Sequence, residues 1–313
     1  MMRWISRGTS LLAIRERPSR YARAPVSKLT PALGVVRIRQ QSVEAGEGML
    51  PRDTHPEAHL FQLGLYRAMS LERKGNIAAQ LSNAIRSVAC SGIRLRHPDY
   101  SDAEACRALM ALLFGETACY PTQKGSCPMV FDPTPFLACL VNALNQAGVP
   151  FMLAGSFASS MHGVPRATRD LDFVIDPTSK LLERLLGHLA REELYLDATV
   201  ARAELRRRGQ FNVIDPSTSW KADLIYRKDR AFSHAELERR VPVTVLGVPL
   251  FVATAEDTVL AKLEWAKLGP SERQLDDVRG IIEAQAGTLD RAYVERWLDV
   301  LGVRELWELV GQG

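Results

Sequence analysis

Three aspartates lie in stretches that are otherwise apolar, where a carboxylate is costly. Asp170 and Asp172 are two residues apart in DLDFVID, so on a strand their side chains share one face. Asp223 lies in a second apolar stretch, KADLIY. Carboxylates in such surroundings need a compensating cation, and Mg²⁺ prefers carboxylate oxygens combined with substrate phosphates. The pattern predicts a Mg²⁺ (or Mn²⁺) site with these three aspartates as catalytic residues and metal ligands. The alternative is that they cap strand ends or form surface salt bridges.

A Gly-Ser pair precedes these aspartates at a predicted turn from strand to helix. The stretch FMLAG (151–155) predicts a short buried strand, and SFASSMHG predicts a short helix. Backbone N–H groups at the start of such a helix can hold phosphate oxygens. Gly155 lets the backbone approach a phosphate, and Ser156 adds a hydroxyl donor. Both are therefore predicted to bind nucleotide.

Nearby basic residues have two interpretations each. Arg166 could contact a triphosphate or, with Arg169, only balance the aspartates. Lys221 would share a strand face with Asp223, which allows a phosphate contact or a solvated lysine at the strand edge. His162 precedes a glycine at a helix end, where a capping or packing role is commoner than a catalytic one.

These pieces, in this order, resemble the DNA polymerase beta-type nucleotidyltransferase superfamily. The segments GSFASSMHGVPRATRDLD, KAD (221–223), EDTVLAKLEW and ERQLDDV are most similar to its bacterial abortive-infection, toxin-like minimal nucleotidyltransferase branch. The resemblance covers about residues 134–311 and leaves residues 1–133 outside it.

The resemblance implies transfer of a nucleoside monophosphate from an NTP such as ATP to a hydroxyl, with release of pyrophosphate. It implies that Asp170 and Asp172 bind two metal ions. Asp223 would hold the metal nearest the acceptor and help to take its proton. Gly155 and Ser156 would grip the β- and γ-phosphates.

The resemblance also places Lys262 and Asp277 on helices that close over the nucleotide, with Lys262 as a nucleotide-binding residue. The alternative for both is an ordinary role on a helix surface. Acceptors in such families include tRNA, proteins and small molecules. A toxin-like role with a cognate antitoxin-like protein partner follows from the branch alone. A non-catalytic module that senses nucleotides or binds a partner on the same fold is the competing hypothesis.

The elements that must position these residues predict an α/β (α+β) fold of the nucleotidyltransferase type, with a mixed sheet flanked by helices. Ile77, Leu81, Ile85 and Val88 recur at helical spacing, and Ser101 with Glu104 forms a capping box. The predicted organisation is a disordered tail (1–68), a helical hairpin or appendage (69–115), a linker (116–133), the core (134–254) and a C-terminal helical subdomain (255–313).

The net charge of +4 is concentrated at the N-terminus, where residues 1–68 hold eleven Lys/Arg against five Asp/Glu. The remainder is near neutral, so a pI of 8.8 does not indicate nucleic-acid binding. A transit peptide, or a true start at Met49 or Met69, is an alternative to the disordered tail.

No apolar run approaches the roughly 20 residues of a membrane span, so we expect a soluble protein with no membrane partner. The five cysteines include no Cys-x-x-Cys pair, which disfavours a disulfide framework or zinc site and favours a cytoplasmic location.

Overall fold

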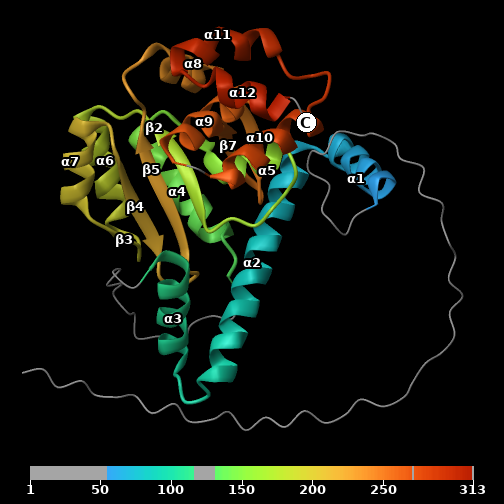
Figure 1. The fold of residues 1–313 in the computed structure, drawn as a ribbon. Helices are drawn as coiled ribbons and strands as arrows, with labels where there is room; N and C mark the ends of the chain where they lie inside the picture. The colour runs from blue at the N-terminus through green and yellow to red at the C-terminus, as the bar shows by residue number, and fades with distance from the viewer. Residues whose placement is uncertain (1–54, 116–130, 270, 312–313) are drawn as a thin grey trace, which may run out of the picture. The chain divides into compact units, whose positions relative to one another are not determined.

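The structure, a computed structural model, describes residues 55–115, 131–269 and 271–311. Residues 1–54, most of the predicted tail, and 116–130, most of the predicted linker, lie outside the described residues. The described part holds twelve helices and one seven-stranded sheet (Figure 1). The predicted α/β class with a mixed sheet flanked by helices is confirmed. None of the described helices is long and apolar enough to cross a membrane.

The sheet mixes parallel and antiparallel pairs, in the order β3-β4-β5-β2-β1-β7-β6. The central strand β2 is antiparallel to β1 and parallel to β5, and β1 is parallel to β7. The strands are β1 (Phe151–Ala154), β2 (Asp170–Ile175), β3 (Tyr195–Leu196), β4 (Gln210–Asp215), β5 (Trp220–Tyr226), β6 (Val241–Val245) and β7 (Val248–Val252). The predicted hairpin at Gly247 is the β6–β7 turn, where that residue has φ 78°.

Alternation along β2 orients the predicted catalytic aspartates. Leu171, Phe173 and Ile175 are buried in the main core, while the residues between them are only half-buried. Because successive strand side chains point to opposite faces, Asp170 and Asp172 share the face away from that core. The prediction that they share one face is confirmed.

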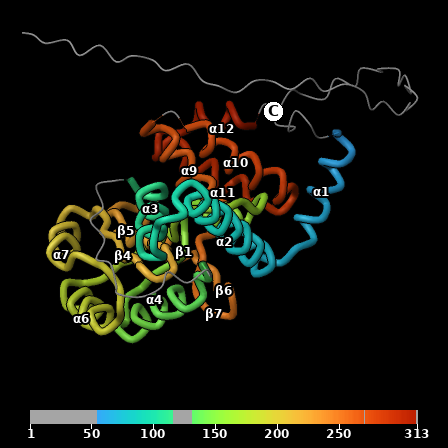
Figure 2. Tube along the Cα trace, turned by 90° about the horizontal axis from the view of Figure 1, so that it is seen from below, coloured from blue at the N-terminus to red at the C-terminus, as the bar shows by residue number. Residues whose placement is uncertain are grey.

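Two neighbouring helices, α4 (Thr134–Ala147) and α6 (Ser179–Leu189), supply leucines to this core (Figure 2), and α2 (Leu71–Arg96) adds Ala79. Gly148 ends α4 with φ 73°, as predicted. Between β1 and β2 lies α5 (Gly155–His162), and between β3 and β4 lies α7 (Ala198–Arg207). The sequence did not predict α7 or β3.

The N-terminal part of the described chain contains α1 (Pro56–Ala68), α2 and α3 (Asp102–Phe114). The capping box of Ser101 and Glu104 at the start of α3 is confirmed. Disorder was predicted where α1 lies, and that prediction is wrong for these residues. Only Leu63 of α1 is buried, and Arg67 donates to the carbonyl of Glu283. A helix with so few apolar contacts shows little hydrophobic periodicity.

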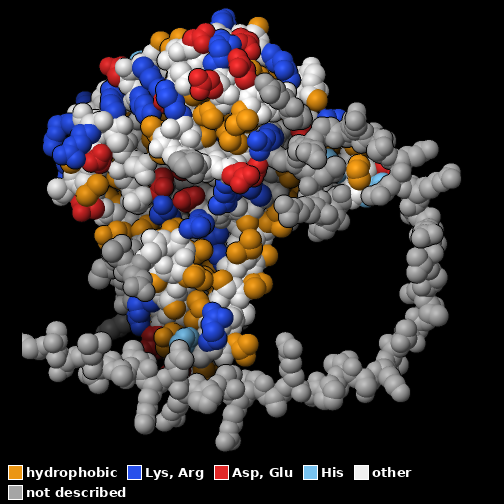
Figure 3. Space-filling model, viewed as in Figure 1, with side chains coloured by type: hydrophobic (Ala, Val, Ile, Leu, Met, Phe, Trp, Pro, Cys, Tyr) orange, Lys and Arg blue, Asp and Glu red, His pale blue; other side chains and the backbone are white. Residues whose placement is uncertain are grey.

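The face that α2 buries is not its apolar one. Leu81, Ile85 and Val88 are exposed, and Figure 3 shows hydrophobic side chains at the surface over α2 and α3. The buried face holds small and polar residues instead, including Gly75 and Ser82. A Cβ at Gly75 would lie 3.4 Å from Met161 Cγ, so small side chains allow α2 to approach α5 closely.

A second apolar cluster joins α9 (Ala255–Leu268), α10 (Glu272–Ala284), α11 (Arg291–Leu301) and α12 (Arg304–Gly311). Phe232 of α8 (Ala231–Arg239) also belongs to it. The sequence did not predict α8. The helical C-terminal region is thus present with a core of its own, and the boundary at residue 254 stays a prediction.

Candidate active site

The turn from β1 into α5 has room for no side chain. Gly155 has φ +59°, and a Cβ there would lie 1.8 Å from Asp172 Oδ2. Glycine is therefore required twice, for its backbone conformation and for the close approach. The next residue, Ser156, donates its backbone N–H to Asp172 Oδ2 at 3.4 Å. The predicted phosphate-binding turn and the aspartate strand are in direct contact.

Parallel pairing of β2 with β5 brings the third aspartate beside the first two. Asp172 is the partner of Asp223, and Asp170 is the partner of Lys221. Residues in register on neighbouring strands point to the same face, so three carboxylates and one ammonium group meet on one surface. The three aspartates, which come from two strands 51 residues apart in the chain, line one cavity.

This gathering of negative charge changes the protonation of Asp172. Burial, and then the charges of Asp170 and Asp223, raise the pKa of Asp172 to about 6. Asp223 is buried and accepts a hydrogen bond from Asn212 Nδ2 on the neighbouring strand β4. A cation placed between these carboxylates would be attracted by all three and would relieve their mutual repulsion.

Lys221 neutralises part of this charge. Its Nζ lies 2.8 Å from Asp223 Oδ1 and 3.4 Å from Asp170 Oδ2. Burial lowers the pKa of Lys221, whereas its hydrogen bond to Asp223 and the charges of both aspartates raise it. The raising effects are larger in sum, so the net shift of the pKa is upward. Of its two interpretations, the solvated edge lysine does not describe this half-buried, doubly paired side chain.

A second ionic group holds basic residues against the Gly-Ser turn. Asp277 of α10 accepts from Lys262 Nζ at 2.8 Å and from Arg166 Nη2 at 2.6 Å. Both bases also donate to Ser156 Oγ, Arg166 from 2.9 Å and Lys262 from 3.3 Å. Burial lowers the pKa of Lys262, although Asp277 opposes the shift. Two cations are thus fixed beside the helix start where an anion would bind.

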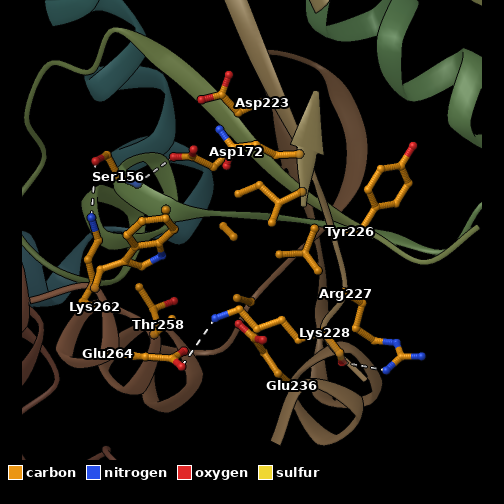
Figure 4. A pocket seen from close by; sticks show the side chains of 18 of the residues that line it. Ser156, Asp172, Asp223, Tyr226, Arg227, Lys228, Glu236, Thr258, Lys262 and Glu264 are labelled. Atoms are coloured by element: carbon orange, nitrogen blue, oxygen red, sulfur yellow. Dashed lines mark hydrogen bonds and ion pairs between the residues drawn. The ribbon is translucent and has the colours of Figure 1, made fainter. Parts of the chain in front are cut away.

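A cavity of about 330 Å³ joins these groups. Figure 4 shows Ser156, Asp172 and Asp223 at one end, with Glu236 and Lys228 at the other. Val174 and Ile225, the next residues along the face that carries the aspartates, also line this cavity. The α9 side chains of Ala261, Lys262 and Trp265 form a wall. The volume is that of a small-molecule site.

The aspartates fit Mg²⁺ in their donor chemistry, since they are oxygen ligands crowded on neighbouring strands. Within the described ranges, however, no three His, Cys, Asp or Glu side chains are arranged to hold a metal ion. The contacts explain this: Lys221 bridges Asp170 and Asp223, while Asp172 faces the N–H of Ser156. Mg²⁺ is commonly held by one or two carboxylates plus substrate phosphates, so a complete protein cage is not required.

The structure brings together every residue predicted for the site. These residues are Gly155, Ser156, Arg166, Asp170, Asp172, Lys221, Asp223 and Lys262. His162 is buried, with Nε2 2.7 Å from the carbonyl oxygen of Ala253, which is the packing role. Sequence reasoning missed Asn212 and Glu236. Asn212 could have been found only from the β4–β5 register, and Glu236 only from α8.

Similarity to known proteins is found in the structure and not in the sequence. No family model matches it, and no curated protein matches it. One similar solved structure is a crystal structure of ANT(2'')-Ia in complex with adenylyl-2''-tobramycin. It has a TM-score of 0.37 and 13% identity, and the match covers 55% of this chain and 97% of that one.

Two further solved structures are similar at the same level. A crystal structure of an antigenic nucleotidyltransferase-like protein from Paracoccidioides brasiliensis has a TM-score of 0.33 and 12% identity, covering 55% of this chain and 91% of that one. A solution structure of the antibiotic-resistance factor ANT(2'')-Ia has a TM-score of 0.31 and 14% identity, covering 56% and 94%. Likeness this weak transfers no activity.

Proposed function

We propose that this chain is a metal-dependent nucleotidyltransferase, which moves a nucleoside monophosphate from an NTP to a hydroxyl acceptor. One observation carries the proposal: the β2–β5 register aligns Asp172 with Asp223, and the Gly155–Ser156 turn lies against the same carboxylate. An anion-binding helix start beside clustered carboxylates suits a substrate that carries both phosphates and divalent metal.

Different side chains bind different parts of the substrate. The N-terminus of α5, with Ser156, Lys262 and Arg166, binds the β- and γ-phosphates. Asp170, Asp172 and Asp223 would hold Mg²⁺ or Mn²⁺, with Asp223 on the acceptor side. When bound, the metal neutralises negative charge on the phosphates and on the attacking oxygen. Lys221 moves from between the aspartates to a phosphate oxygen.

The reaction is an in-line displacement at the α-phosphorus. The acceptor oxygen forms a new P–O bond, the bond to the bridging oxygen breaks, and pyrophosphate leaves. The acceptor proton passes to Asp223 and then to solvent. Little covalent chemistry is asked of the protein, so the rate comes from positioning and from fixed charges.

Label transfer tests the proposal directly. The full chain is incubated with each α-labelled NTP, Mg²⁺ or Mn²⁺, and a mixture of tRNA, cell protein and small molecules. We expect label in one acceptor class, its loss in Asp172→Asn, and its retention in Asp229→Asn, a variant at an exposed carboxylate bonded to His234. Absence of metal-dependent NTP binding would exclude the proposal.

The acceptor belongs to one of three classes, namely tRNA, a protein side chain or a small molecule. A toxin-like role with an antitoxin-like partner is part of this proposal and rests on the sequence resemblance. Induced expression tests it: the wild-type chain should stop growth of the expressing cells, whereas Asp172→Asn should not. Equal growth of the two would exclude the toxin-like role and leave the transferase proposal standing.

A second candidate function is a nucleotide sensor that carries out no transfer. The ion pairs of Lys221 with Asp223 and Asp170 favour it, because the lysine supplies the positive charge that a metal would otherwise bring. For a sensor, NTP should raise the melting temperature equally with and without Mg²⁺. For a transferase, Mg²⁺ should increase that shift, because it binds together with the phosphates.

A further inference from the structure

The end of the cavity farthest from the aspartates in Figure 4 contains a carboxyl group without a partner. Glu236 of α8 is 7% exposed and lines the cavity. In the described part of the chain, its side chain takes part in no recorded hydrogen bond or ion pair. Buried polar groups are normally paired, so a nearly buried carboxyl that faces a cavity indicates a missing partner.

The basic side chains near Glu236 are paired with another carboxylate. Lys228 and Arg230 are close enough to influence it, and both are already paired with Glu264. Asp257 of α9, also nearby, is held by Arg239 and by the Tyr293 hydroxyl. Burial, and then Asp257, raise the pKa of Glu236 to about 8. At neutral pH the group is a neutral acid with one O–H donor and one carbonyl acceptor.

The cavity between the two ends suits a flat apolar body. Val174 follows Asp172 on the same face of β2, about 7 Å along the strand. Ile225 follows Asp223 on the same face of β5, and the two residues are neighbours across the pair Val174↔Ile225. A nucleotide with its α-phosphate at the aspartates therefore has its sugar and base over this apolar floor, with Glu236 beyond it.

We propose that Glu236 binds the polar edge of the nucleotide base, pairing its O–H and carbonyl with an adjacent acceptor and N–H donor on the base. This inference rests on the proposed function and assigns the part of the same cavity that selects among nucleotides. Glu236 is a binding residue and takes no part in the chemical step.

Three variants separate hydrogen bonding from packing. Glu236→Gln keeps one donor and one acceptor in a similar shape, whereas Glu236→Leu keeps only the volume. Glu238→Gln, at an exposed position on the same helix, is the control. Each is assayed with Mg²⁺ for binding of the four NTPs and of inorganic tripolyphosphate, which has the phosphates but no base. Melting temperatures without ligand report folding.

We expect the wild type to bind one or two NTPs better than tripolyphosphate. Glu236→Leu should lose about tenfold in affinity for those NTPs and nothing for tripolyphosphate. Glu236→Gln should keep the NTP affinity near neutral pH and also keep it at pH 9, where the wild type weakens as its acid ionises. Glu238→Gln should match the wild type.

Equal loss of NTP and tripolyphosphate binding in Glu236→Leu would overturn the inference, because the effect would then be structural. Loss of acceptor use with unchanged NTP binding would overturn it in favour of an acceptor site. Metal-dependent NTP binding that Glu236→Leu leaves intact would remove only this inference. A wild type that binds neither NTP nor tripolyphosphate would remove the proposed function together with it.

Discussion

Two neighbouring regions bury charge along β2 and β5 and treat it in opposite ways. Arg86 of α2 is 1% exposed, stacks 3.8 Å from the centre of the Trp220 ring, and donates to backbone carbonyls. These carbonyls belong to Ser82, Thr168, Arg169 and Ser219. We call Arg86 with these contacts the Arg86 anchor. One residue after Arg169 the aspartate cluster begins, where carboxylates face one another instead of donors.

The difference separates charge that holds the fold from charge that awaits a ligand. The anchor ties α2 to the carbonyls just before β2 and β5, so it fixes both strands that carry the aspartates. Its guanidinium is satisfied by the protein itself. In the cluster the protein supplies the N–H of Ser156, the Thr168 hydroxyl, Asn212 and Lys221, and the pKa of Asp172 nevertheless stays raised. Removing charge should therefore cost stability in one region and activity in the other.

The largest expected effect is on activity in Asp172→Asn. The amide cannot bind metal as a carboxylate does, so transfer should fall roughly 10³-fold. Stability should be unchanged or higher, because one of three mutually repelling charges is removed. Labelled transfer and urea unfolding measure the two quantities. A loss of stability comparable to the loss of activity would show that the cluster also holds the fold, and the contrast between the regions would fail.

The next effect is on stability in Arg86→Met. Several buried carbonyls lose their donor, so the free energy of unfolding should fall by about 3 kcal/mol. Specific activity per folded molecule should change little, as the methionine leaves every aspartate in place. Urea unfolding and active-site titration measure these. Arg73→Met, at an exposed position of the same helix, is the control and should leave both quantities as they are.

The sequence could predict the cluster because its signal is local. Alternation in DLDFVI places two aspartates on one face, and a glycine before a serine marks the turn. The anchor is not predictable in this way, because its acceptors lie 82, 83 and 133 residues from Arg86. The buried face of α2 was not predicted for a related reason. Small residues such as Gly75 and Ala78 reveal burial only when the helix packed against them is known.

The same limit applies to the far end of the cavity. Glu236 lies on a helix with few apolar residues, and nothing in AFSHAELER distinguishes it from Glu238. Only the tertiary surroundings of α8 bury one of these glutamates and leave the other exposed. Local patterns thus predicted the groups that we propose act on phosphate. The proposed base-binding residue depends on tertiary packing that no local pattern shows.

A smaller effect sharpens the contrast at Asp277, which is both satisfied and placed at the site. Asp277→Asn should lower kcat/KM by about 10- to 100-fold, since Lys262 and Arg166 lose the carboxylate that holds them at Ser156. Unlike Asp172→Asn, it should also lower stability, because two part-buried cations lose their partner. The control is Asp276→Asn, whose carboxylate pairs with Arg279. Unchanged stability in Asp277→Asn would place it with the aspartate cluster.

The smallest effect is the pH dependence of stability at Glu236. This buried carboxyl avoids carrying a charge by keeping its proton, rather than being neutralised by a protein cation or a ligand. Below about pH 4.5, its ordinary pKa, the carboxyl is protonated in both folded and unfolded chains. Above that value the unfolded chain releases the proton, whereas the folded chain keeps it until about pH 8.

The wild type should therefore lose stability relative to Glu236→Gln as pH rises from 4.5 to 8, and the gap should then stay constant. We expect the difference in melting temperature to widen by roughly 5 °C across this window. A saturating, metal-bound NTP should extend this widening above pH 8, because a base paired with the neutral acid stabilises the protonated form and raises its pKa further. A wild type that instead gains stability relative to Glu236→Gln as pH rises would mean that Glu236 is ionised and paired, and it would then belong with the charges that hold the fold.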